Sequence, residues 1–299
     1  MEGPATRSHL FSLTMPSTPW TKPDTSTRPI AVIGAGVMGR RISMMWISAG
    51  YKVILCEKSI DGYDSAVDYI TENKDQQAEK LGTDVAELKV TDSLQEAAEN
   101  AWMVIEAVPE KLEMKIDILA EIDAIAPPDC VIASNSSSLR TSQMIVKTKK
   151  NYRICNGHYY MPPEQTYYEV MSCGETDPDI FPFLMEKAKS AGFQPVHAKV
   201  ESTGLVFNRI WASIKREVLL VLAEGVSDGH TVDEMFKGWF KAAKGPCQMM
   251  DTVGLDTVYN IEVVYTQQRD LDTTARDWLK ETYVDKGNLG AKGGKGLLG

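Results

Sequence analysis

The feature that most constrains the fold is a glycine-rich turn between a short buried strand and a helix. The run PIAVIG (29–34) is apolar and β-branched, which predicts a buried strand. The segment AGVMGRRISMMWISAG follows with apolar residues at helical spacing and ends at Gly50, as helices often do. Between the two, Gly34, Gly36 and Gly39 fit the pattern G-x-G-x-x-G. This order is typical of the first unit of a parallel α/β sheet.

The alternation of strands and helices continues to about residue 140. Apolar runs predict further strands at 51–57, 101–110 and 130–139. Helical spacing predicts helices at 61–81 and 112–126, and Pro127-Pro128 ends the second. The pattern predicts the α/β class, with a doubly wound parallel sheet of the Rossmann type.

The pattern changes from Thr203 onward. A long, largely buried helix is predicted by apolar residues at Leu205, Ile210, Ile214, Val218 and Leu222, with Trp211 and Val221 beside them. Further helical segments follow without strands. We therefore expect an α/β domain at 29–200 and an all-α C-terminal domain at 201–299. The first 28 residues are rich in Pro, Ser and Thr, and we expect a flexible tail rather than a targeting signal.

Charge and cysteine usage exclude several classes of function. The net charge of −9 argues against a nucleic-acid partner, and no apolar run is long enough to span a membrane. Five cysteines lie scattered without metal-ligand or redox spacing. We therefore expect no metal site and a location in a reducing compartment, the cytoplasm.

The glycine motif and Glu57 predict a dinucleotide site. The first glycine makes a tight turn, the second admits a pyrophosphate, and the third allows close helix–strand packing. Val37 and Met38 complete the loop at the start of the helix. Glu57 ends the second strand, where a carboxylate binds ribose hydroxyls and repels a 2′-phosphate. NAD is therefore favoured over NADP, although Lys58 weakens the preference. The alternative is a glycine-rich turn without a ligand.

A histidine and a glutamate occupy facing positions in a predicted hairpin. YRICNGH ends at His158, Pro162 and Pro163 turn the chain, and TYYEV returns with Glu169. A carboxylate beside an imidazole fixes its tautomer and raises its pKa, as a general acid/base requires. The alternative is a core histidine that bonds to a tyrosine hydroxyl.

Two polar residues are candidates for holding a substrate oxygen. Ser137 follows a strand at its carboxyl end, where ligands bind in open α/β sheets. Its alternative role is helix capping before Leu139, with Ser138 as the other candidate cap. Asn208 lies near the apolar line of the long helix, where a buried amide needs a partner. An interhelical hydrogen bond is the alternative there.

Several segments together resemble one family. EAVPEKLEMK, SNSSSL, GHYYMPPEQTYYEV, GLVFNR, GPCQMMDTVGLDT and GNLGAKGGKG occur in the order and spacing of the L-3-hydroxyacyl-CoA dehydrogenase family, across residues 29–299. The wider superfamily includes L-gulonate dehydrogenase and the related lambda-crystallin. The resemblance implies an NAD-dependent homodimeric oxidoreductase that interconverts a 3-hydroxy and a 3-oxo group.

The resemblance also implies roles for individual residues. His158 is the acid/base, Glu169 orients it, and Ser137 and Asn208 hold the reacting oxygen. Four further residues match positions that contact the cofactor, namely Glu110, Lys115, Asn135 and Lys292. For the three charged ones, the alternative is a solvated surface charge.

The chain departs from the family pattern at two places. Met161 stands where the family has Asn, and Asp61, Asp64 and Asp68 occupy a helix where the family has polar and basic contacts to coenzyme A. These departures keep two alternatives open. One is a related enzyme that acts on a sugar acid or specialised metabolite free of coenzyme A. The other is an NAD-binding protein that has lost turnover.

Overall fold

The computed structural model describes residues 20–299, and their first part is built on one sheet of eight strands. The strand order is β3-β2-β1-β4-β5-β6-β7-β8. The strands are β1 (Ile30–Ile33), β2 (Val53–Cys56), β3 (Leu88–Thr91), β4 (Met103–Glu106), β5 (Val131–Ser134), β6 (Ile154–Tyr159), β7 (Tyr167–Ser172) and β8 (Gln194–Ala198). Neighbouring strands are parallel except for the antiparallel pair β6–β7. The order reverses around β1, where open α/β sheets form their ligand crevice.

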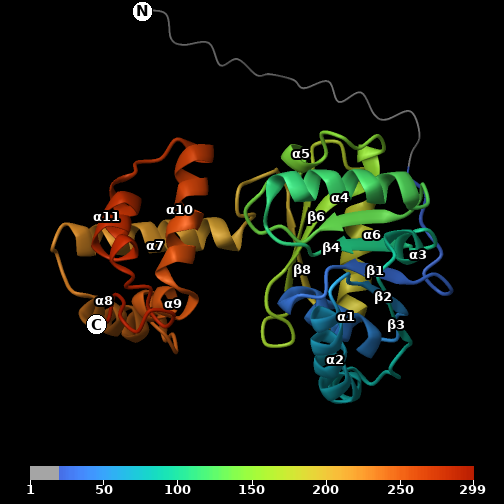
Figure 1. Ribbon diagram of the computed structural model, residues 1–299, viewed down its shortest axis with the longest axis horizontal. Coiled ribbons are helices and arrows are strands. Elements are labelled where there is room, and N and C mark those ends of the chain that lie inside the picture. Colours follow the sequence, from blue (N-terminus) through green and yellow to red (C-terminus); the bar gives the residue numbers. More distant parts are fainter. Residues whose placement is uncertain (1–19) are drawn as a thin grey trace, which may run out of the picture.

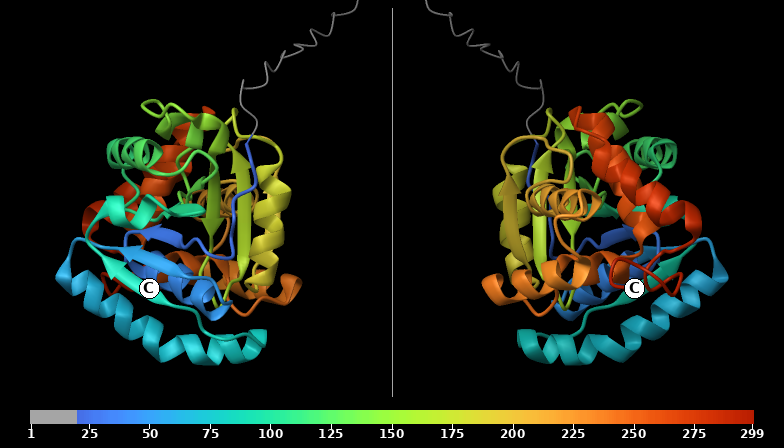
Figure 2. Two further views of the ribbon diagram at one scale, coloured as in Figure 1. Left: turned by 90° about the vertical axis from the view of Figure 1, so that its right-hand side faces the viewer. Right: turned by 90° about the vertical axis from the view of Figure 1, so that its left-hand side faces the viewer.

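Helices cover both faces of this sheet, as Figures 1 and 2 show. They are α1 (Val37–Ser48), α2 (Ile60–Leu81), α3 (Leu94–Ala98), α4 (Leu112–Ile125), α5 (Thr141–Met144) and α6 (Ile180–Ser190). Helices α1, α2 and α6 pack on one face around Trp46 and Trp102. Helices α3, α4 and α5 pack on the other, where Leu119 and Ile122 are fully buried. Both faces of the sheet are therefore removed from water.

Most elements expected in the α/β part are present, and Gly50 takes a left-handed conformation (φ +85°) directly after α1. Strands β3 and β8 and helices α3 and α6 were not predicted. The strands β3 and β8 lie at the two edges of the sheet and are largely half-buried or exposed. Edge strands lack the continuous apolar run that marks a central parallel strand.

The second part is helical and lies beside the sheet (Figure 1). Its helices are α7 (Phe207–Ala223), α8 (Gly229–Phe240), α9 (Pro246–Val253), α10 (Leu255–Arg269) and α11 (Thr274–Thr282). The predicted class, a doubly wound sheet followed by a helical part, is confirmed. No helix of residues 20–299 is long and apolar enough to cross a membrane.

Two expectations were wrong. Helix α7 is buried along only part of its apolar line, because Val218 is buried while Ile210, in the first turn, is 55% exposed. Residues 20–28 are also not a free tail. The buried Trp20 indole donates to the Asp129 carbonyl (2.8 Å), and Arg28 pairs with the Asp129 carboxylate (2.6 Å). The tail expected at 1–19 lies outside the described residues.

Candidate active site

The glycine loop after β1 has two structural glycines and one that faces open space. Gly34 has φ +99°, and a Cβ there would lie 2.9 Å from the Ala107 carbonyl. A Cβ on Gly39 would lie 1.8 Å from the Gly34 carbonyl, so the helix can approach the strand only without it. A Cβ on Gly36 would meet nothing within 4 Å. The loop therefore leaves a cradle at the N-terminus of α1, which suits an anionic pyrophosphate.

Glu57 lies where β2 ends and lines an open pocket of about 520 Å³. Its carboxylate accepts hydrogen bonds from the backbone amides of Ala35 and Ser59, both at 2.9 Å. The negative charge therefore lies beside the glycine loop, as an NAD site requires. Asp64 lines the same pocket, while Asp61 and Asp68 are exposed on α2.

A buried charge network lies beneath the carboxyl ends of β4 and β5. Lys115 is 1% exposed and pairs with the fully buried Glu106 at 2.7 Å, so the alternative of a solvated surface charge is not observed for Lys115. Ser134 donates to the other oxygen of Glu106 at 2.5 Å. Glu106 and Ser134 were missed from the sequence. The one signal was a glutamate that ends an otherwise apolar strand.

Glu110 fixes the serine loop. One of its oxygens accepts hydrogen bonds from the Ser136 hydroxyl and from the amides of Ser137 and Ser138. Burial alone would raise the pKa of Glu110, but Lys115 and these bonds outweigh it and lower the pKa. The Ser138 hydroxyl also donates to Glu110, so neither Ser137 nor Ser138 caps a helix before Leu139.

His158 and Glu169 face each other across β6 and β7, in the register the hairpin predicts. His158 is 6% exposed, and its Nδ1 has no hydrogen-bond partner in the described chain. Burial lowers the pKa of His158 to about 4, although Glu169 and Glu110 act in the opposite direction. Glu169 therefore does raise the pKa of His158, as expected, but desolvation of the imidazolium is the larger effect and the net shift is downward.

The carboxylate of Glu169 forms its hydrogen bonds with groups other than His158. It accepts hydrogen bonds from the Tyr160 hydroxyl (2.6 Å) and from the backbone amides of Val206 (2.7 Å) and Phe207 (3.0 Å). The Tyr160 ring lies edge-on to His158, with centroids 4.6 Å apart, but its hydroxyl does not bond to the imidazole. The tyrosine-bonded core histidine is therefore not observed. Glu169 instead ties the hairpin to the start of α7, which carries Asn208 as its next residue.

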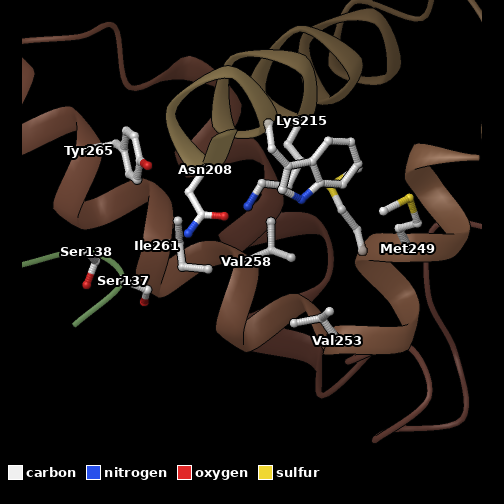
Figure 3. Close-up of a pocket in the computed structure, with 11 residues that line it drawn as sticks. Ser137, Ser138, Asn208, Lys215, Met249, Val253, Val258, Ile261 and Tyr265 are labelled. Carbon is white, nitrogen blue, oxygen red and sulfur yellow. The ribbon is translucent and has the colours of Figure 1, made fainter. Parts of the chain in front are cut away.

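Ser137 and Asn208 line one pocket of about 150 Å³, although they lie in different parts of the chain (Figure 3). Parallel pairing of β5 with β6 places the serine loop beside the end of β6. The Tyr159 amide donates to Asn135 Oδ1 at 2.8 Å and holds that loop near His158. Lys215 and Tyr265 also line the pocket and were missed from the sequence, because the pocket forms only where side chains of α7, α9 and α10 come together.

Two other candidates lie apart from this pocket. Lys292 pairs with Asp256 at 2.9 Å and bonds to the Thr257 hydroxyl, both in the helical part. The structure does not bring it to the other cofactor candidates. Met161, at the position where the family has Asn, is 43% exposed in the β6–β7 turn.

Comparisons with known proteins match both parts of the fold. Residues 29–201 match the family model for the NAD-binding domain of 3-hydroxyacyl-CoA dehydrogenase, and 204–298 match the model for its C-terminal domain. A 3-hydroxyacyl-CoA dehydrogenase-like protein of Cochliobolus heterostrophus is 47% identical over 48% of this chain, and the match spans 31% of that protein. An L-carnitine dehydrogenase of Nocardiopsis dassonvillei is 32% identical over 77% of this chain and 72% of its own. The solved structure of (S)-3-hydroxybutyryl-CoA dehydrogenase from Ralstonia eutropha has a TM-score of 0.81 at 26% identity, covering 90% of this chain and 98% of that one.

Proposed function

This chain belongs to the 3-hydroxyacyl-CoA dehydrogenase family, and we propose that His158, Ser137 and Asn208 form a site that interconverts a 3-hydroxy and a 3-oxo group. The chain is an NAD-dependent oxidoreductase by its family, and the proposal concerns which residues carry the reaction. The observation that supports them best is that Ser137 and Asn208 line one pocket, and that the loop of Ser137 follows β5, the neighbour of the strand β6 that carries His158.

The cofactor residues come from two edges of the crevice. The Gly36 cradle, Val37 and Met38 at the start of α1 would hold the pyrophosphate, and Glu57 the adenosine ribose. Toward the nicotinamide we place Glu110, Lys115 and Asn135, which lie at or beneath the carboxyl ends of β4 and β5. Bound NAD supplies a carbon atom that accepts or returns a hydride.

In the direction of oxidation, His158 removes the proton of the substrate hydroxyl. Its lowered pKa keeps the imidazole neutral at neutral pH, which a base requires. The negative charge of Glu169 stabilises the imidazolium that forms, and the same carboxylate fixes the first turn of α7. Ser137 and Asn208 donate hydrogen bonds to the oxygen on which charge develops. In the direction of reduction, protonated His158 is the acid.

The test is replacement of His158 by Gln. We expect kcat for NADH-dependent reduction of acetoacetyl-CoA or acetoacetate to fall about 10²–10⁴-fold, since the general acid is lost. NADH affinity, measured by fluorescence, should stay within about twofold, because His158 lies outside the glycine loop. His197→Gln, at an exposed histidine of β8, is the matched control and should keep full activity. Near-full activity of His158→Gln would refute the assignment. A wild type that binds NADH but turns over neither substrate would favour the NAD-binding protein without turnover.

We also propose that the chain is a homodimer. Helix α8 exposes three large apolar side chains, Met235 (71%), Trp239 (85%) and Phe240 (65%). Contiguous exposed apolar residues of this size mark an interaction surface.

The remaining proposals are the division into domains at 29–200 and 201–299 and a cytoplasmic location. The location is supported by five free, buried cysteines.

A further inference from the structure

Lys215 is a buried cation inside the pocket that holds Asn208. It is 5% exposed and follows Asn208 by two turns of α7, a rise of about 10.5 Å. Long side chains on a helix lean toward its N-terminus, which brings the ammonium group back toward Asn208. Figure 3 shows the Lys215 nitrogen pointing into the pocket beside the Asn208 amide.

The Lys215 ammonium group has no partner in residues 20–299. It forms no hydrogen bond and no ion pair within that part of the chain, and Glu262 is the carboxylate that acts on its pKa. Glu262 is already paired with Arg216, whose guanidinium lies 2.8 Å away. One carboxylate therefore faces two cations, and the charge of Lys215 stays uncompensated. Burial lowers the pKa of Lys215 to about 8, with Glu262 opposing and Arg216 adding to the shift, so the charge is present at neutral pH.

The remaining walls of the pocket restrict what can pair with Lys215. They are mainly apolar, with Trp211, Met249, Val253, Val258 and Ile261 among them. The volume of about 150 Å³ is that of a cavity known to hold a benzene ring. An unpaired buried charge is costly, and a carboxylate of a small ligand satisfies it with a charge-assisted hydrogen bond.

We propose that Lys215 binds a carboxylate of the substrate, so that the substrate class is a small 3-hydroxy or 3-oxo acid. The inference rests on the proposed function of Ser137, His158 and Asn208. The reacting oxygen of the substrate then lies at Ser137 and Asn208, and its carboxylate lies deeper in the helical part, at Lys215. A coenzyme A thioester has no free carboxylate at its first carbon. Its nucleotide phosphates belong to a group far larger than this pocket.

The experiment compares two ligands that differ in charge and hardly in shape, acetoacetate and acetoacetamide. Lys215→Met removes the charge and keeps a chain of similar length. We expect it to raise KM for acetoacetate about 10–100-fold, the range for a hydrogen bond to a charged group, and to change KM for acetoacetamide less than threefold. Lys286→Met, at an exposed lysine of the same part of the chain, is the control and should leave both KM values unchanged.

A binding measurement separates this inference from the proposed function. With NAD⁺ present acetoacetate cannot be reduced, so quenching of tryptophan fluorescence reports binding alone, and Trp211 lines the pocket. We expect Kd for acetoacetate to rise about 10–100-fold in Lys215→Met, with a thermal unfolding temperature no lower than that of the wild type, because the substitution removes an unpaired buried charge. Charge-dependent binding without any turnover would overturn the proposed reaction and retain the anion site.

Three outcomes would overturn the anion site itself. They are an equal loss for acetoacetamide, an equal loss in Lys286→Met, and a loss for acetoacetyl-CoA as large as that for acetoacetate. The last outcome would mean that Lys215 serves the thioester and not a free carboxylate.

Discussion

At the scale of single residues, the proposed acid/base site depends on how one carboxylate distributes its hydrogen bonds. Both oxygens of Glu169 are taken by Tyr160 and by the start of α7, and Nδ1 of His158 is left without a partner in the described chain. Burial then dominates and lowers the pKa of His158 to about 4. The Tyr160 hydroxyl therefore controls how strongly Glu169 acts on the imidazole.

The pH dependence of oxidation tests this arrangement. A base with a lowered pKa stays neutral down to that pKa, so kcat/KM for oxidation of 3-hydroxybutyrate should be flat from neutral pH to roughly 5. It should fall only as the pH approaches about 4. In Tyr160→Phe, Glu169 is free to bond to Nδ1, and the falling limb should move up toward the ordinary range of histidine, while Tyr167→Phe should not move it. A wild-type limb near 6.5 would contradict the desolvated histidine.

At the scale of the element, the glycines in the turn between β1 and α1 have different roles. Gly39 lets α1 pack against Gly34, where a Cβ would lie 1.8 Å from a backbone oxygen. Gly36 has an ordinary backbone conformation (φ −59°, ψ −170°) and open space in front of it. Packing therefore requires glycine at position 39, whereas at position 36 only a bound ligand requires it.

Two alanine variants should separate these tasks. Gly39→Ala should unfold at a clearly lower temperature than the wild type, because neither the helix nor the strand can yield without breaking its packing. Gly36→Ala should keep the wild-type melting temperature and lose NADH affinity by about tenfold or more, since its methyl group occupies the pyrophosphate cradle. Thermal unfolding and NADH fluorescence titration measure the two effects. Unchanged NADH binding in Gly36→Ala would place the cofactor elsewhere.

At the scale of the whole molecule, the two parts meet at the proposed site. The α/β part contributes Ser137 and the anchor Glu169, and the helical part contributes Asn208 and Lys215. The far side of the helical part leaves α8 uncovered, with Trp239 as its most exposed large apolar residue. A self-complementary contact between two copies would cover this face without obstructing the site.

Replacement of Trp239 by Ser tests the homodimer. A large aromatic residue at the centre of an interface carries much of its binding energy, so the variant should elute as a monomer at micromolar concentration where the wild type is a dimer. Light scattering after size exclusion measures the mass. Val226→Ser, at another exposed apolar residue in the loop before α8, should leave the dimer intact. A wild-type monomer, or a Trp239→Ser dimer of unchanged affinity, would exclude this surface as the interface.

Features that depend on local spacing could be predicted from the sequence. The spacing of apolar residues, together with the glycine and proline residues that end elements, located β1, α1 and α4. The glycine motif identified Gly34, Gly36 and Gly39. The prolines at 162 and 163 predicted the hairpin that pairs His158 with Glu169. Each of these follows from residues that are close along the chain, where side-chain periodicity and turn chemistry decide the conformation.

Tertiary packing alone sets which charged groups are removed from water. It buried Lys115 beside Glu106, turned Glu169 toward α7, lowered the pKa of His158 and left Lys215 unpaired in a pocket. Burial and electrostatic interaction depend on what packs against a side chain, and for Lys215 the carboxylate that acts on its pKa, Glu262, lies on the later helix α10. No periodicity in the sequence encodes such an approach. The residues of the candidate site could therefore be named from the sequence, but their electrostatic environment could be described only from the fold.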